Sequence, residues 1–491
     1  MNSSRILALF FPEFALQHLV RERPELQGGA IVIHAGGGGK ARTCAMSDSA
    51  LRAGIRVGWS LPQARARFPT LLCLPRDEAG EKRSMEAIAE ALGWVSPRTV
   101  WKEGDCLLLN LGGTAHLHGG EEALARGVEA SLQSQGVRAR GAVADRPATA
   151  QAMAGHGGGD FTIVPPGEDR AALGGLPICA LNEDARIVTA LTAVGIHHLR
   201  AVAALGEHEM ARRFGDAGVR IHQKSRGVWQ EVLSWHRSQA PLRERMDLPD
   251  PCLALEGLAF ALRSLLIRLE GRMQGRGVAT VGWSLELEMD VGVPHVESFR
   301  LSCPQRGASV LLAMARHRLQ HVRLPEPVVA IAVWTEGVQA FAGSQENLLD
   351  GTARGGEPLH ALLGRLSAAL GTEAVHSLQP ADSHRPESAV SRRPFQPTDR
   401  SAGGGRPAGV RPTRLLQTPE SLSFSSDGRG VFWRGRRRLI DHMGPVERLC
   451  GEWWDRPFQR DYHVLTLAEG GRWWIYRDGR LGEWRLHGFF E

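Results

Sequence analysis

RILALFFPEFALQHLVRERPEL, residues 5–26, is the stretch that decides the fold of the first domain. It opens with an unbroken apolar run over residues 6–11, which is typical of a central strand covered on both faces. Pro12 interrupts the run, and apolar residues then recur at helical spacing as far as Val20, so a helix follows. α/β folds commonly place ligands where such a strand meets the next helix, but the junction here offers no carboxylate.

The composition is that of a large globular protein of three or four domains, with 491 residues of which 43% are hydrophobic. A net charge of +6 fits a nucleic-acid partner better than an acidic one. The seven cysteines contain no CxxC pair, so we expect reduced, mostly buried thiols in a cytoplasmic protein. No N-terminal signal and no long apolar span is present, so neither export nor a membrane is expected.

Residues 241–340 predict a compact α+β domain. Leucines between Leu258 and Leu269 form one helical face, and apolar residues alternate strictly with polar ones from Val281 to Met289. With a short first strand at Leu253–Leu255, the order is βαββαβ. Two helices on one face of the sheet leave its other face free to contact a DNA duplex. The arginines of this domain would supply positive charge for the phosphates. The alternative is a basic face that contacts only solvent. The candidate DNA-binding residues are Arg263, Arg268, Arg272, Arg276, Arg300, Arg316 and Arg318.

Three further segments add a family resemblance. Residues 24–33 (PELQGGAIVI), residues 50–62, with ALRAGIR and then SLP, and residues 107–120, with LLLNLGG and then LHGG, resemble the palm and fingers of Y-family translesion DNA polymerases. The chain is most similar to the ImuB group, the polymerase-shaped accessory proteins of bacterial damage-induced mutagenesis, and the resemblance covers nearly all of it. It implies a multidomain α/β and α+β fold: palm and fingers (1–170), a helix-hairpin-helix-like thumb (171–240), a little finger (241–340), a clamp-motif segment and flexible linker (341–411) and a β-rich C-terminal module (412–491).

An active polymerase of this type needs carboxylates on neighbouring strands to hold two magnesium ions. The resemblance places these positions at Phe10, Pro12, Asp105 and Cys106, of which only Asp105 is a carboxylate. We therefore expect no polymerase activity, no metal and no cofactor. An active Y-family polymerase with displaced carboxylates is the alternative.

The residues that would hold a triphosphate are also replaced. The family's Tyr and Arg fall at Asp48 and Leu51, and its Lys falls near Gln151. An Asp at the first position would repel a phosphate. Four independent replacements thus favour a protein that has lost the reaction.

Three shorter patterns favour structure over chemistry. The run Gly36–Lys40 lacks the Ser or Thr that a phosphate loop needs, because Ala41 follows, and predicts a hairpin tip. His116 and His118 alternate along an expected strand without a third metal ligand, so we interpret them as a surface pair. In the thumb, residues 182–185 (NEDA) replace the glycines of the family's DNA-binding hairpin, which predicts a structural role.

The last third of the chain suggests contacts with other proteins. Gln345, Leu348 and Leu349 resemble the bacterial sliding-clamp peptide, for which a plain amphipathic turn is the alternative. Residues 380–412 are rich in Pro, Gly, Ser and Arg and predict a flexible linker. Beyond them, dense aromatics suit a small β core or a binding hot spot. The candidate partner-binding residues are Trp453, Trp454, Trp473 and Trp474.

Together these patterns predict a non-catalytic scaffold of translesion synthesis. The resemblance implies that it joins DNA and the sliding clamp to a RecA-like partner of the ImuA type and to an error-prone C-family polymerase. The rivals are an active translesion polymerase and a DNA-binding protein with no polymerase partner.

Overall fold

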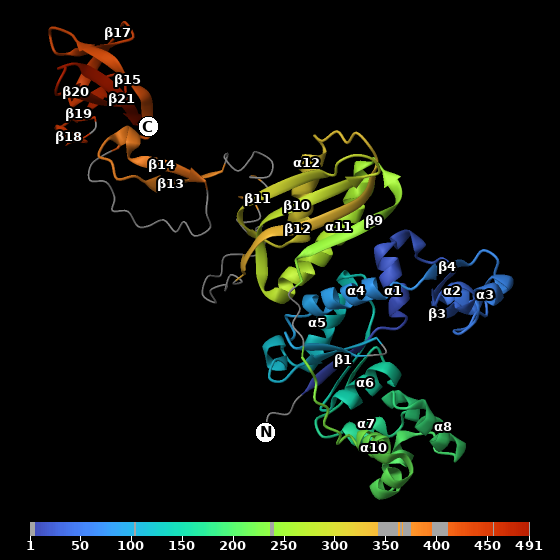
Figure 1. Cartoon of the computed structure of the whole chain (residues 1–491). Coiled ribbons are helices and arrows are strands. Elements are labelled where there is room, and N and C mark those ends of the chain that lie inside the picture. Colours follow the sequence, from blue (N-terminus) through green and yellow to red (C-terminus); the bar gives the residue numbers. More distant parts are fainter. Residues whose placement is uncertain are drawn as a thin grey trace. The chain divides into compact units, whose positions relative to one another are not determined.

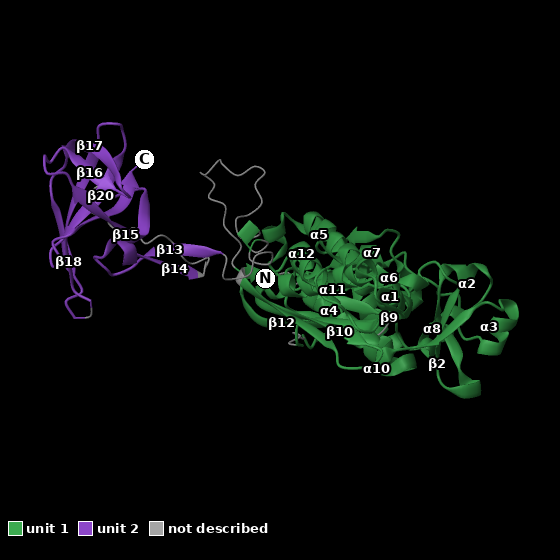
Figure 2. Cartoon of the chain, turned by 90° about the horizontal axis from the view of Figure 1, so that it is seen from above, with its two compact units in different colours: residues 1–369 green, residues 370–491 purple. Residues whose placement is uncertain are grey.

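The chain forms two compact units, residues 1–369 and 370–491 (Figure 2). The computed structural model describes residues 5–102, 105–235, 240–341, 362–363, 366, 375–394, 411–454 and 456–490. None of the helices in these ranges has the length and apolar character needed to cross a membrane. The described cysteines are all free, but only Cys106 is buried, so the expectation that most of them are buried is wrong.

The palm is a five-stranded sheet with β1 at its centre, flanked by antiparallel β6 and β7 in the order β5-β6-β1-β7-β8. Leu7 and Leu9 pack against helices α4 and α5, whereas Ile6 and Ala8 pack against α6. The sheet is thus covered on both faces, as the apolar run predicts. The elements are β1 (Ile6–Phe10), β5 (Thr99–Lys102), β6 (Cys106–Asn110), β7 (Arg140–Ala144), β8 (Phe161–Ile163), α4 (Glu78–Ala91), α5 (Glu121–Ser134) and α6 (Pro147–His156).

The fingers form a separate small sheet, which is joined to the palm through α1. Strand β2 pairs with β3 through a tight connection, and Ala35 lies opposite Arg42, so the expected hairpin tip at Gly36–Lys40 is confirmed. The expected strand at His116 and His118 is wrong, because these residues lie in a 3-10 helix at Ala115–His118. The elements are α1 (Phe14–Glu22), β2 (Ile31–Ala35), β3 (Arg42–Met46), β4 (Leu72–Pro75), α2 (Asp48–Arg52) and α3 (Leu61–Arg67).

The thumb is helical and has its own apolar core. The predicted hairpin at residues 182–185 connects a 3-10 turn to α8, with Asn182 in the left-handed conformation and Asp184 capping α8. Gly215, with φ of 61°, marks a kink inside α10. The elements are α7 (Asp169–Leu173), α8 (Ala185–Ala193), α9 (Leu199–Ala203) and α10 (Glu207–Ser225).

The little finger confirms the βαββαβ order, with strands arranged β11-β10-β12-β9 and both helices packed on one face of the sheet (Figure 1). The predicted first strand at Leu253–Leu255 is wrong. The strand ends at Cys252, and Leu255 already begins the helix. The elements are β9 (Arg243–Cys252), α11 (Leu255–Arg276), β10 (Val278–Met289), β11 (His295–Gln305), α12 (Ala308–Leu319) and β12 (Val328–Ala340).

The second unit is a seven-stranded β sheet that closes on itself, because β17 pairs with β16 and also with β19. A hairpin of β13 (His376–Pro380) and β14 (Val390–Pro394) docks against it through Arg385–Glu452 and Arg460–Glu387 ion pairs. Residues 380–394, predicted as linker, are therefore ordered structure, and residues 395–410 lie outside the described ranges. The strands of the barrel are β15 (Arg414–Phe424), β16 (Gly430–Trp433), β17 (Arg436–Met443), β18 (Glu447–Gly451), β19 (Phe458–Leu467), β20 (Arg472–Asp478) and β21 (Trp484–Phe490).

Candidate functional site

The palm sheet brings together the four positions at which an active relative would hold metal. Phe10 ends β1 and lies directly opposite Cys106 of β6. The next residue, Phe11, donates its backbone N–H to the carbonyl of Asp105 at 2.9 Å, and Pro12 follows. The register thus places an aromatic ring, a thiol and one carboxylate at the end of the central strand.

These side chains form a poor set of magnesium ligands. Magnesium prefers oxygen, which the ring of Phe10 cannot supply. Burial, followed by the charge of Asp105, raises the pKa of the Cys106 thiol to about 12, so it stays protonated at neutral pH. The guanidinium of Arg140 lies 5.1 Å from the centre of the Phe10 ring, which places a fixed positive charge beside this position.

Asp105 is half-buried and sits in an electrostatically crowded place. Burial first, and then the charge of Glu81, raises the pKa of its carboxyl, while Arg76 opposes the shift. Arg76 is already engaged, because it holds both oxygens of Glu81 at 2.7 to 3.1 Å. Within the described ranges, no group of three or more His, Cys, Asp or Glu side chains is arranged to hold a metal.

The residues that replace the triphosphate grip lie on two helices. Asp48 and Leu51 are both on α2, with Leu51 exposed, and Gln151 is on α6 of the palm. Neither the ionised Asp48 nor the apolar Leu51 can donate a side-chain hydrogen bond to a phosphate. The structure thus gives no cationic grip at these three positions.

The open face of the little-finger sheet carries both charges. Side chains that lie opposite one another across the strands share a face, so Ser298, Ser284, Trp334 and Arg243 form one row on it. The charged residues of this face are Arg243, Arg245, Asp247, Glu286, Glu288, Arg300 and Glu336. Since acids outnumber arginines here, the expectation of a basic face for a duplex is wrong.

Three of the predicted DNA-binding arginines are held in ion pairs, and of these Arg268 and Arg272 are buried while Arg276 is half-buried. Arg268 pairs with Glu22 of α1 at 2.8 Å, and Arg272 pairs with Glu90 of α4 at 2.7 Å. Arg276 also reaches Glu90, at 2.7 Å. The prediction that these three contact phosphates is wrong in this arrangement, because carboxylates of the palm already hold their charges.

The other four predicted arginines are exposed. Arg300 lies on the open face, whereas Arg263 belongs to α11 and Arg316 and Arg318 to the last turns of α12. Arg318 pairs with Glu297 at 2.9 Å. Sequence reasoning missed Arg243 and Arg245, and the alternation of residues 243–248 (RERMDL) was the signal that could have assigned them to a strand.

In the second unit, the four candidate tryptophans divide into two pairs. Trp473 and Trp474 are buried in the barrel, so the prediction that they bind a partner is wrong. Trp453 and Trp454 remain 79% and 70% exposed, with their ring centres 5.5 Å apart in an edge-to-face arrangement. The clamp-motif residues Gln345, Leu348 and Leu349 lie outside the described residues.

Comparison with known proteins agrees with the sequence-based resemblance. Residues 9–155 match the sequence profile of the impB/mucB/samB family, designated IMS. Curated proteins named Protein ImuB from two strains of Caulobacter vibrioides are 30% identical over 459 residues, which cover 89% of this chain and all of those proteins.

Solved structures similar to the chain include an insertion ternary complex of Dbh DNA polymerase and DinB from Sulfolobus solfataricus. Both are 15% identical, with TM-scores of 0.41 and 0.40; they cover 67% and 69% of this chain, which in turn covers 97% and 100% of theirs. The impB/mucB/samB profile fits the palm and fingers, and the 30% identity spans the full length of the curated relatives. This chain therefore belongs to the ImuB family.

Proposed function

We propose that the chain is a non-catalytic, polymerase-shaped scaffold that binds DNA during translesion synthesis after damage. The observation that carries this proposal is the pairing of Phe10 with Cys106, because two adjacent metal positions then lack an oxygen ligand. Membership of the ImuB family supports the link to DNA damage and to a polymerase-like role.

Primer extension tests the proposal. The purified chain should bind primer–template DNA yet add no nucleotide with Mg²⁺ or with Mn²⁺. An active polymerase with displaced carboxylates is the second candidate, favoured by the closeness of Asp105 to Glu81 and Glu13, whose charges act on its pKa. Extension that disappears in Asp105→Ala, while Asp48→Ala keeps it, would establish that rival and overturn the proposal.

Contact with DNA phosphates is proposed for the exposed arginines of the little finger, with Arg263, Arg300 and Arg316 as the main contacts and Arg318, which is paired with Glu297, as a weaker one. Their exposure and the overall positive charge support this assignment. Binding that rests on such contacts should weaken steeply with salt.

Clamp binding is proposed for Gln345, Leu348 and Leu349 on the sequence pattern alone. Replacing the three by Ala should abolish binding to a bacterial sliding clamp and leave DNA affinity unchanged. Clamp affinity that survives the replacement would disprove the assignment.

The exposed pair Trp453 and Trp454 is proposed to contact a partner protein, with the RecA-like protein and the C-family polymerase as the partners that the resemblance implies. Large aromatic side chains that stay exposed are typical of binding hot spots. Trp453→Ala with Trp454→Ala should lower affinity for at least one of the two partners. An unchanged affinity for both would place the partner surface elsewhere.

A further inference from the structure

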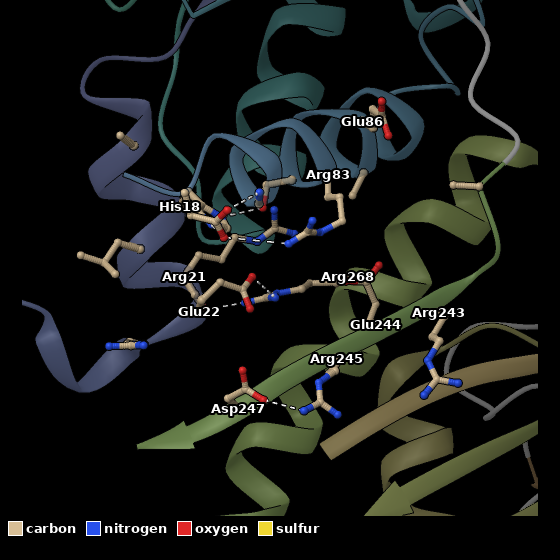
Figure 3. Close-up of a pocket in the computed structure, with 18 of the residues that line it drawn as sticks. His18, Arg21, Glu22, Arg83, Glu86, Arg243, Glu244, Arg245, Asp247 and Arg268 are labelled. Carbon is tan, nitrogen blue, oxygen red and sulfur yellow. Dashed lines mark hydrogen bonds and ion pairs between the residues drawn. The ribbon is translucent and has the colours of Figure 1, made fainter. Parts of the chain in front are cut away.

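A cavity of about 690 Å³ lies where the palm meets the little finger. Its walls come from α1 and α4 of the palm and from β9 and α11 of the little finger (Figure 3). A volume of this size is in the range that accommodates a nucleotide-sized molecule. The site is separate from the end of β1, but it borders the open face discussed above, because Arg243, Arg245 and Asp247 belong to both.

Most of the charge in the cavity wall is paired. Arg268 reaches across to Glu22 at 2.8 Å, and Arg245 holds Asp247 at 2.8 Å (Figure 3). Arg272 is held between Glu90 and Glu244, each at 2.7 Å. Each of these arginines therefore has at least one carboxylate partner.

Among the buried arginines of this wall in the described residues, Arg21 alone has no carboxylate partner. Its side chain is buried, with the residue 8% exposed, and no carboxylate in the described part of the chain lies within 4 Å of it. Within the described residues, its side chain makes one long hydrogen bond, from Nη2 to Gln135 Oε1 at 3.3 Å, and its Nε has no partner. A buried cation without a counter-ion is costly, and an anion would offset the cost.

A second guanidinium stands beside the first. Arg268 donates to the backbone carbonyl of Arg21, and its own Nε is also buried without a partner in the described ranges. Burial first, and then the charge of Arg268, lowers the pKa of Arg21 to about 9, so the group is still charged at neutral pH. Two adjacent guanidinium groups that line one cavity suit the oxygens of a phosphate, which accept paired hydrogen bonds from such groups.

Acidic residues elsewhere on the wall limit the size of the ligand. Asp77, Glu86 and Asp247 line the same cavity, and the side chains of Asp77 and Asp247 are more than half exposed. A nucleic-acid strand that ran past them would meet repulsion, whereas a compact ligand could keep its charge near Arg21. We propose that this cavity binds a small phosphate-bearing molecule of nucleotide size, with Arg21 and Arg268 as the phosphate-binding residues.

Ligand binding to the full chain tests the proposal. The probes are inorganic phosphate, pyrophosphate, a deoxynucleoside monophosphate and triphosphate, and a 5′-phosphorylated oligonucleotide, each measured by calorimetry and by the shift in Tm. At least one small phosphate compound should bind and raise the Tm of the wild-type protein. Arg21→Gln should weaken that binding by about tenfold or more, the size expected for a lost charged hydrogen bond.

The variant also separates binding from a structural role. Without ligand, Arg21→Gln should have a Tm equal to or above that of the wild type, because it removes an uncompensated buried charge. Arg212→Gln, which removes an exposed arginine of α10 in the thumb, is the matched control and should bind as the wild type does. The proposal is overturned if no small phosphate compound binds, if Arg21→Gln binds with unchanged affinity, or if only the oligonucleotide depends on Arg21.

Discussion

Arg272 of the little finger places its Nε 2.7 Å from Glu90 of the palm, and both side chains are buried. The two residues lie on different domains, 182 positions apart in the sequence. Glu90 also holds Arg276 at 2.7 Å, so one carboxylate joins two arginines of α11 to α4. This contact fixes the little finger to the palm by charges that water does not screen.

Removing this carboxylate should destabilise the first unit. Glu90→Gln leaves the buried Arg272 and the half-buried Arg276 each with one acidic partner fewer, and losses of about 3 kcal/mol are usual for a broken buried ion pair. Urea unfolding monitors the change. Glu86→Gln, one turn earlier on α4 and half-buried, is the control and should change stability by less than about 0.5 kcal/mol. Equal stability of both variants would show that the contact contributes nothing.

Close backbone packing at the same place gives a second prediction. A Cβ on Gly275 of α11 would lie 1.7 Å from the carbonyl oxygen of Glu90, and this backbone atom cannot move aside easily. Gly275→Ala should therefore force α11 away from α4 and cost about 1 to 3 kcal/mol, although alanine favours helices. Gln274→Ala, at the exposed neighbouring position, should leave stability unchanged or raise it slightly. A Gly275→Ala protein as stable as the wild type would contradict the packing.

The arginines of the little finger should differ in their contribution to DNA binding, according to whether a carboxylate already pairs with them. Arg263, Arg300 and Arg316 are exposed and have no carboxylate within 4 Å in the described ranges, whereas Arg243, Arg245 and Arg318 each have one. Changing the first three to Gln should weaken DNA binding and flatten its dependence on salt by up to about 0.9 in the log–log slope for each lost phosphate contact. The second trio loses the same charge but should have a smaller effect, because its arginines are already neutralised. Fluorescence anisotropy over a salt series measures both, and a larger effect of the second trio would refute the assignment.

The barrel should lose stability in acid. His487 is fully buried and its Nδ1 lies 2.8 Å from the Tyr462 hydroxyl; burial, more than any charge nearby, lowers its pKa to about 4. The unfolded imidazole binds a proton below about pH 6.5, while the native one does not until about pH 4, so stability falls as the pH drops through this window. Burial alone would raise the pKa of Glu387, but hydrogen bonds from Arg460 outweigh burial and lower that pKa below its usual value. The stability that the ionised Glu387 contributes to the barrel is therefore also lost in acid.

Amide exchange of residues 458–490, corrected for intrinsic rates, measures the effect. Protection in the wild type should fall between pH 6.5 and 4.5 by an amount on the order of 3 kcal/mol at most. His487→Gln should have lower protection at neutral pH and a flatter dependence over this window. A wild-type profile that does not change with pH would contradict the predicted titration.

The parts of the fold that repeat a local pattern could be predicted from the sequence. The apolar run of β1 indicates a strand buried on both faces, and the alternation of β10 indicates a strand with one face in the core. Both strands are found where they were expected. Arg268, Arg272 and Arg276 recur every four residues, and such a stripe on a helix looks the same whether phosphates or carboxylates face it. The palm acids that pair with them lie 182 to 246 positions away, and even Glu244, the second partner of Arg272, is 28 positions away, so no local window contains the answer.

Two glycines in the sequence could have corrected the prediction that these arginines face DNA. Gly271 and Gly275 interrupt the same helix at the same spacing, and glycines inside a helix often mark a close approach of backbones. The tryptophan pairs show the same difficulty, because both are adjacent aromatic residues in the sequence, yet Trp473 lies in a buried strand and Trp453 in an exposed turn.

In the barrel the first strand pairs with the last, since Arg414 of β15 lies opposite Phe489 of β21. The two ends of the module therefore leave it side by side, at the same end of one antiparallel pair. A pulling force applied through those ends would open the hydrogen bonds between β15 and β21 one after another, as a zip opens, instead of loading them together. This pair of strands should therefore separate under a smaller force than strands that are pulled along their length.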